Sequence, residues 1–224
     1  MLLLATDTSG KHGSIALAEC EPREECRILE LVPLAGGTFS AQLVPQIAAL
    51  LAKHGFAKRD IGAFAVASGP GSFTGLRVGL AAIKALSEVL EKPIAAVSLL
   101  EAVAESSRSR GKILAALDAG RNEVYVGECE IGQGRTLFIS EKLLPREQCF
   151  EAAVDATIVT PDQNLAEAAR LRGLRAEEVE QPRSDAIARL GWRKILAGQT
   201  VSPEELEANY IRRSDAEIFA RSSL

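Results

Sequence analysis

Four consecutive residues near the start of the chain suit phosphate and Mg²⁺ chemistry. Asp7 ends an apolar run that begins at Leu2, and Thr8, Ser9 and Gly10 follow it directly. A carboxylate can orient the water ligands of Mg²⁺, while the N–H groups of a turn rich in hydroxyl residues and glycine can bind phosphate oxygens. Asp7 and the three residues after it are therefore a candidate vestigial nucleotide-binding turn.

A second apolar run, from Ile113 to Leu117, ends at Asp118 in the same way, so Asp118 joins the candidate nucleotide-binding residues. Each run leads through a turn into a returning apolar run, which predicts two hairpins of similar design and hence two lobes of related architecture. The second half has no Gly-Gly pair that would make room for an adenosine. This absence argues against strong ATP binding by the chain alone.

The most distinctive stretch runs from Ser68 to Leu80 and is rich in glycine. Its spacing is one residue too long for the dinucleotide fingerprint Gly-x-Gly-x-x-Gly, and no Gly-Lys-Ser/Thr follows. Ser72 does not lie in Gly-x-Ser-x-Gly, which argues against a nucleophile elbow. Glycine lets another backbone approach closely, so the stretch serves packing or docking, and the spacing alone leaves a plain structural turn open.

The elements around these motifs alternate between strands and helices. Apolar runs predict strands, among them Ala63 to Ala67 before the glycine-rich turn, and helical periodicity predicts helices at about 40–54, from the turn to 91, and at about 184–197. The fold class expected is α/β with mixed sheets and flanking helices. We place one lobe in residues 1–108 and the other in 109–224, with a C-terminal segment that can pack back on the first, and a hinge near Ser106–Gly111.

Composition excludes several functions. The chain has 224 residues, of which 47% are hydrophobic, and its 26 basic and 30 acidic residues give a net charge of −4, which does not attract nucleic acid. The two histidines, His12 and His54, have no signature of a metal site or of a hydrolase, so no catalytic residue and no metal ligand is assigned.

The four cysteines contain no Cys-x-x-Cys pair, and we expect reduced thiols. The opening run lacks the positive charge of a signal peptide, and no apolar run is long enough to cross a membrane. A cytoplasmic protein without membrane contact is expected.

Three motifs resemble the TsaB (YeaZ) family, whose members are accessory subunits of bacterial tRNA threonylcarbamoyladenosine synthesis. They are Ala5-Thr6-Asp7-Thr8-Ser9, the stretch Gly69 to Leu80, and Asp118-Ala119 with Glu123-Val124-Tyr125; a weaker match is Tyr210-Ile211-Arg212. Phe39, Gly120 and Ala208 stand where relatives often have His, Arg and Pro. These departures bear on local contacts and leave the central motif intact.

The resemblance implies a two-lobed fold of the actin, Hsp70 and sugar kinase superfamily (ASKHA). It implies a non-catalytic scaffold that pairs with the catalytic paralogue TsaD and with the ATPase TsaE to modify adenosine 37 of tRNAs that read ANN codons. A homodimer is the other pairing, tRNA is reached through the complex, and ATP or ADP is left open at the joint between subunits, with no cofactor on the chain itself. Two further classes stay open: a free-standing ATP-dependent phosphotransferase and, ranked lower, a peptidase.

The face that the partner or second copy contacts is predicted from the small residues at helical spacing. Gly75, Gly79 and Ala82 lie one helical turn apart, and such residues suit close packing either with another helix or with the chain's own sheet. The full predicted interface is Gly71, Ser72, Phe73, Thr74, Gly75, Leu76, Gly79, Leu80 and Ala82. A bulky substitution such as Gly79→Glu is expected to abolish association and leave the fold largely intact.

Overall fold

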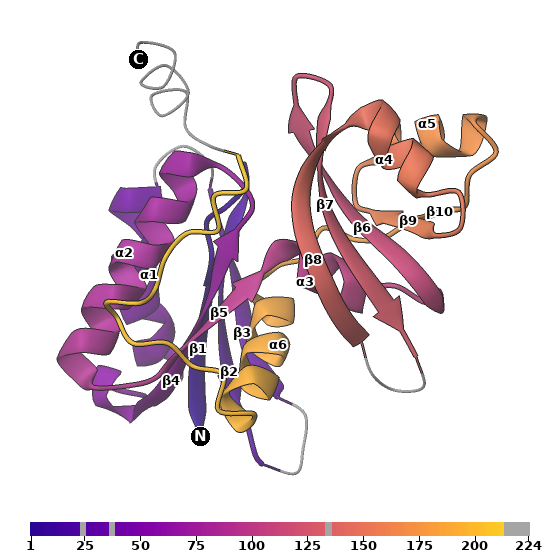
Figure 1. The fold of residues 1–224 in the computed structure, drawn as a ribbon. Helices are drawn as coiled ribbons and strands as arrows, with labels where there is room; N and C mark the ends of the chain where they lie inside the picture. Colours follow the sequence, from indigo (N-terminus) through magenta and orange to yellow (C-terminus); the bar gives the residue numbers. More distant parts are fainter. Residues whose placement is uncertain (23–25, 36–38, 133–135, 213–224) are drawn as a thin grey trace. The chain divides into compact units, whose positions relative to one another are not determined.

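The structure is a computed structural model that describes residues 1–22, 26–35, 39–132 and 136–212. The chain forms two units, each with its own sheet (Figure 1). The first unit comprises Met1–Ala102 and Pro182–Ala208, and the second comprises Val103–Gln181 and the segment that begins at Asn209. The predicted boundary between residues 108 and 109 lies at Ala102 and Val103 in the structure, and the C-terminal segment that was expected to be able to pack back on the first lobe is Pro182–Ala208, whose helix packs on the first sheet.

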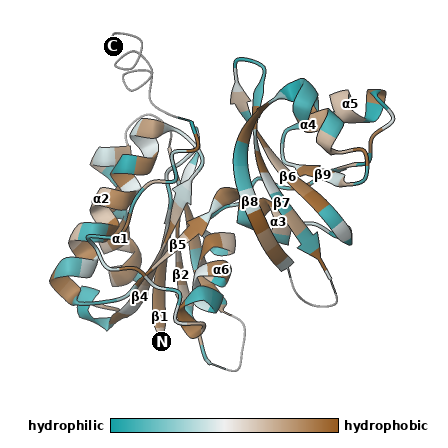
Figure 2. Ribbon diagram, viewed as in Figure 1, coloured by the Kyte–Doolittle hydropathy of each residue, from teal (hydrophilic) through white to brown (hydrophobic). Residues whose placement is uncertain are grey.

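The sheet of the first unit has five strands in the order β3-β2-β1-β4-β5. The first three strands are antiparallel neighbours, and β4 and β5 run parallel to β1. β1 and β4 are buried along almost their whole length and largely brown, the colour of apolar residues, in Figure 2, as expected for strands covered on both faces. The strands are β1 (Leu2–Asp7), β2 (Gly13–Glu19), β3 (Arg27–Leu34), β4 (Ile61–Gly69) and β5 (Ile94–Ser98).

Three helices cover this sheet. α1 (Phe39–Lys53) and α2 (Phe73–Leu90) share one apolar core with its strands, while α6 (Ser184–Leu196) packs on β1, β2, β4 and β5 from the opposite face (Figure 1). Gly191 lets α6 lie directly on β4, because a Cβ atom at this position would collide with the Cβ atom of Ala65. Trp192 on α6 is buried, as its place in the apolar stripe predicts.

The sheet of the second unit repeats the design of the first. Its order is β10-β9-β6-β7-β8, which is the order of the first sheet if β6 takes the place of β1. β6–β7–β8 are antiparallel and β9 and β10 run parallel to β6, so the predicted repeat of hairpins is confirmed. The elements are β6 (Gly111–Gly120), β7 (Glu123–Ile131), β8 (Thr136–Pro145), α4 (Arg146–Ala152), β9 (Thr157–Thr160), α5 (Gln163–Leu171) and β10 (Ala176–Glu178).

The predicted α/β class with mixed sheets is therefore confirmed. Three elements were not predicted: the short 3₁₀ helix η1 (Lys58–Asp60), the helix α3 (Leu99–Glu105) and the strand β10. The segment Ser106–Gly111, predicted as a hinge, is held within the second unit, where the carboxylate of Glu177 accepts hydrogen bonds from the backbone of Arg108 and the hydroxyls of Ser107 and Ser109.

The prediction of four reduced cysteines is wrong for two of them. Cys20 and Cys26 form a disulfide, while Cys129 and Cys149 are buried and outside any disulfide. The pairing follows from the fold, because the two cysteines flank the connection between the neighbouring antiparallel strands β2 and β3. In the described part of the chain, the helices are too short or too polar to cross a membrane.

Candidate functional site

Asp7 and the turn after β1 lie inside the first unit. The Asp7 side chain is buried, and its Oδ1 atom accepts hydrogen bonds from the backbone N–H of Ser9, at 2.9 Å, and from the Ser9 hydroxyl, at 2.5 Å. Thr8 and Ser9 are buried as well, whereas Gly10 is exposed. The carboxylate and the Ser9 N–H that the sequence analysis assigned to Mg²⁺ waters and phosphate are thus bonded to each other.

Burial governs the electrostatics of this turn. Removal of the Asp7 carboxyl from water raises its pKa, and the hydrogen bonds from the hydroxyl and the N–H of Ser9 oppose this shift without cancelling it. A carboxyl group that binds its proton more tightly than usual is a poorer partner for a cation. The main role of the Asp7 side chain is therefore to stabilise the turn through its hydrogen bonds with Ser9.

The N-terminal half of α2 packs against this turn. The Thr8 hydroxyl donates a hydrogen bond to the carbonyl oxygen of Gly75 at 2.7 Å, and the N–H of Ser72 donates one to the carbonyl oxygen of Ser9 at 2.7 Å. A Cβ atom at Gly75 would collide with the Thr8 carbonyl oxygen, and one at Gly79 would lie 2.5 Å from the Thr8 hydroxyl oxygen. Glycine at these two positions lets α2 contact the turn that follows β1.

The prediction that Gly75, Leu76, Gly79 and Leu80 contact a partner is therefore wrong. All four are buried in the first unit, with Leu76 and Leu80 in the apolar core shared with β1 and β4. The expectation for Gly79→Glu is wrong for the same reason, since a side chain there would push α2 off Thr8. The variant would damage the fold before it could report on association.

The rest of the predicted interface is accessible. Gly71, Ser72, Phe73 and Thr74 are exposed, and Ala82 is half-buried. Ser72 also caps α2, because its hydroxyl accepts a hydrogen bond from the N–H of Gly75 at 3.3 Å. The exposed start of α2 is therefore ordered by its own cap.

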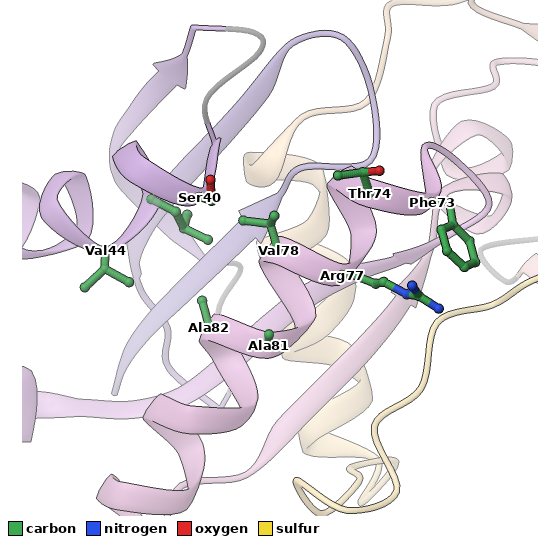
Figure 3. Close-up of a pocket in the computed structure, with 9 residues that line it drawn as sticks. Ser40, Val44, Phe73, Thr74, Arg77, Val78, Ala81 and Ala82 are labelled. Atoms are coloured by element: carbon green, nitrogen blue, oxygen red, sulfur yellow. The ribbon is translucent and has the colours of Figure 1, made fainter.

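A groove of about 450 Å³ lies between α1 and the outer face of α2 (Figure 3). Its walls are almost entirely apolar, and two of its larger side chains, Val44 and Phe73, are 52% and 39% exposed. The lining residues are Ser40, Leu43, Val44, Phe73, Thr74, Arg77, Val78, Ala81 and Ala82. We refer to this set as the α1–α2 groove.

One cationic side chain stands at the rim of the α1–α2 groove. The guanidinium carbon of Arg77 lies 3.7 Å from the centre of the Phe73 ring, close enough for a cation–π interaction. Figure 3 shows both side chains beside each other at the start of α2. An apolar floor with alanine at two positions and an arginine at the edge suits another helix better than a small polar substrate.

Most residues that line the α1–α2 groove were not among the predicted interface residues. Gly75, Gly79 and Ala82 were predicted as the contact face of α2, but the two glycines are buried together with Leu76 and Leu80, and only Ala82 lines the groove. The available signal was the apolar set Val78, Ala81 and Ala82, which lies beside the buried positions of α2 and lines the groove. Ser40, Leu43 and Val44 of α1 complete the groove and could be found only from the fold.

Asp118 lies in the second unit, at the end of β6. Its carboxylate is 3.5 Å from the Arg146 guanidinium, and its side chain is 38% exposed. Asp118 thus has a cation beside it, whereas Asp7 is bonded to a serine in the first unit. Of the described residues, no group of three or more His, Cys, Asp or Glu is arranged to hold a metal ion.

Comparisons with known proteins agree with one another. A family model described as "TsaD: tRNA N6-adenosine threonylcarbamoyltransferase" matches residues 33–170. The tRNA threonylcarbamoyladenosine biosynthesis protein TsaB of Bacillus subtilis is 35% identical over 153 residues, which is 68% of this chain and 63% of that protein. The TsaB protein of Haemophilus influenzae is 28% identical over 95% of this chain and 94% of its own length. The solved structure of YeaZ from Pseudomonas aeruginosa superposes with a TM-score of 0.74 at 28% identity, and covers 93% of this chain and 99% of that one.

Proposed function

The chain belongs to the TsaB (YeaZ) family of tRNA threonylcarbamoyladenosine biosynthesis, and we propose that it is a non-catalytic scaffold subunit of the modifying complex. Its two repeated units have the ASKHA-like fold. In this proposal the chain pairs with a TsaD-type paralogue, which carries out the transfer to adenosine 37 of ANN-decoding tRNAs. A TsaE-type ATPase joins the pair in the cytoplasm.

The observation that carries the proposal is the α1–α2 groove. Val44 and Phe73 expose apolar surface there, and the alanines at 81 and 82 leave room for the ridge of another helix. A paralogue with the same architecture has two corresponding helices to offer. The groove is therefore assigned to the TsaD-type partner, with a second copy of this chain as the occupant when that partner is absent.

The positive charge of Arg77 favours a partner that carries an acidic side chain at this surface. Its guanidinium lies at the edge of the groove, where a carboxylate of the partner could pair with it while the Phe73 ring supports it from the other side. Such rim charges contribute mainly to the association rate and to the choice of partner. We expect an acidic side chain on the partner helix beside Arg77.

Two features support a subunit that leaves catalysis to its partner. The Asp7 carboxylate is buried and bonded to Ser9, so the turn that would hold phosphates is engaged within the chain. The net charge of −4 provides no field for tRNA, which is expected to reach the complex through the partner. ATP or ADP, if it binds near this chain, is expected at the joint between subunits.

A reconstituted transfer reaction tests this function. The chain and a TsaD-type protein are co-purified, and threonylcarbamoyl transfer to tRNA is measured with the TsaE-type ATPase, with and without this chain. We expect stable co-purification, transfer that requires the chain, and no transfer by the chain alone. Transfer of equal rate without the chain would overturn the scaffold role.

The alternative function is a free-standing ATP-dependent phosphotransferase. It requires measurable affinity for ATP and Mg²⁺ at Asp7 and Ser9, which calorimetry on the isolated chain can detect. The bonds within this turn lead us to expect no heat of binding beyond that of an Asp7→Ala variant. A binding signal that disappears in this variant would favour the phosphotransferase.

A further inference from the structure

The Cys20–Cys26 disulfide lies where four segments of the first unit meet. Cys20 follows the last residue of β2, and Cys26 precedes the first residue of β3. Both cysteines are buried, with exposed fractions of 0% and 3%. The bond therefore belongs to the packed interior at this end of the sheet and not to a loose surface loop.

The backbone of each cysteine is tied to a different part of the unit. The N–H of Cys20 donates a hydrogen bond to the Met1 carbonyl oxygen at 2.9 Å, and the Met1 amino group donates one to the Cys20 carbonyl oxygen at 2.8 Å. The Cys26 carbonyl oxygen accepts a hydrogen bond from the Arg189 guanidinium of α6 at 3.1 Å. The disulfide thus joins the start of β1 to α6 through the β2–β3 connection.

The same site can also accommodate the reduced form. The Cys26 sulfur lies 4.0 Å from the Ala188 carbonyl oxygen, at the long limit for the weak hydrogen bond that a thiol can donate. A Cys26 thiol would therefore have an acceptor in place, while Cys20 would remain a small buried apolar group. Neither state requires α6 to leave the sheet.

From these contacts we propose that Cys20 and Cys26 are a reversible thiol–disulfide site whose redox state sets the stability of the β3 edge and its attachment to α6. The co-reactant is a low-molecular-weight disulfide of the glutathione type. When the β2–β3 pairing opens and exposes the reduced pair, a cysteine thiolate attacks that disulfide and releases one thiol, and the second cysteine then attacks the mixed disulfide and releases the other. Two electrons and two protons pass from the cysteine pair to the two released thiols.

The physical effect is expected to be local. In the described residues β3 is an edge strand paired with β2, so its pairing opens more readily than that of the central strands. The disulfide closes a short loop at the end of this strand pair, with a sequence separation of six, and keeps its ends together when the pairing opens. Reduction should loosen β3 and the Arg189 contact while the second unit stays unchanged.

Mass spectrometry can test the redox claim directly. The chain is equilibrated with mixtures of reduced and oxidised glutathione, free thiols are alkylated, and the protein is digested with trypsin. Cleavage after Arg23 separates the two cysteines, so the disulfide appears as a linked pair of peptides. We expect this pair to form and disappear reversibly with the glutathione ratio, while Cys129 and Cys149 remain free thiols throughout.

Hydrogen exchange and thermal unfolding test the structural consequence. Reduction should lower the unfolding temperature and speed amide exchange in β3, with β9 of the second unit as the unchanged internal reference. A Cys20→Ser and Cys26→Ser double variant should unfold like the reduced chain and ignore the reductant. Absence of the linked peptides at every glutathione ratio, or identical unfolding and exchange in the two redox states, would overturn the inference.

Discussion

At the scale of single residues, Thr8 explains the two glycines that the sequence analysis assigned to a partner. Its carbonyl and hydroxyl oxygens occupy the space that side chains at Gly75 and Gly79 would need. Thr8 and Gly75 are 67 positions apart, so no local pattern shows that they touch. The sequence indicated correctly that something approaches these glycines closely, but the identity of the neighbour required the fold.

The substitution Gly75→Ala tests this account. Its Cβ atom would collide with a backbone oxygen that cannot rotate away, so we expect a loss of unfolding free energy of about 3 kcal/mol. Gly10→Ala is the matched control, because its Cβ atom would have no neighbour closer than 3.7 Å, and its effect should stay within about 0.5 kcal/mol. Equal unfolding midpoints in denaturant for the two variants would contradict the packing described here.

Asp7 gives rise to a prediction about pH. Its raised pKa means that the folded chain binds this proton more tightly than the unfolded chain, so its contribution to the unfolding free energy falls as pH rises from about 4 through the folded pKa. Asp7→Asn keeps an oxygen for the two Ser9 donors and removes this titration. The variant should be more stable than the parent chain at pH 7, and its advantage should shrink as the pH is lowered to about 4. Parallel unfolding curves across this range would be inconsistent with a buried, ionisable Asp7.

At the scale of elements, apolar periodicity located most strands and helices because one face of each is buried. The predicted strand Ala63–Ala67 lies within β4, and the helices predicted at about 40–54 and 184–197 are α1 and α6. β10 was missed because Ala176–Glu178 has no apolar alternation. α2 buries Leu76 and Leu80 as well as Gly75 and Gly79, so the small residues do not mark its exposed face.

The anchoring of α6 allows a test at this scale. The hydroxyl groups of Ser14 and Ser184 lie 2.8 Å apart and share a hydrogen bond, and the Ser184 N–H also donates to the Ser14 hydroxyl at 3.0 Å, with both residues buried. A double-mutant cycle with Ser14→Ala and Ser184→Ala should give a coupling energy of about 1 kcal/mol in chemical denaturation. Strictly additive effects would show that these hydroxyls do not hold α6 on the sheet.

At the scale of the whole molecule, the repeat was predictable because each half opens with an apolar run, an Asp and a turn, and both halves do build the same sheet order. A C-terminal segment was expected to be able to pack back on the first lobe, but the sequence did not show that residues 182–208 are the ones that do so. The packing of residues 182–208 on the first unit depends on contacts such as that between Ser14 and Ser184, which are 170 positions apart. Local sequence patterns do not show which residues so far apart in the sequence will contact each other.

The connection that enters the second unit yields a further prediction. Burial opposes the ionisation of Glu177, but hydrogen bonds from Arg108, Ser109 and Ser107 outweigh it and hold the pKa of this carboxyl below its usual range. Glu177→Ala should free the segment and speed tryptic cleavage after Arg108 severalfold. Glu178→Ala on the same strand, whose carboxylate lies 4.0 Å from the Arg170 guanidinium, is the control and should leave the rate unchanged. Equal cleavage rates in the two variants would show that Glu177 does not restrain the segment.

The most direct test of the scaffold role is the affinity of the chain for a TsaD-type partner when the α1–α2 groove carries a charge. Val44→Glu places a carboxylate on the exposed wall of the groove, and Val154→Glu makes the same exchange at an exposed position of the second unit. Calorimetry should show binding weakened at least about tenfold, or about 1.4 kcal/mol, by Val44→Glu, with Val154→Glu and the thermal stability of both variants unchanged. Equal affinity of both variants and the parent chain would contradict the assignment of this groove to the partner.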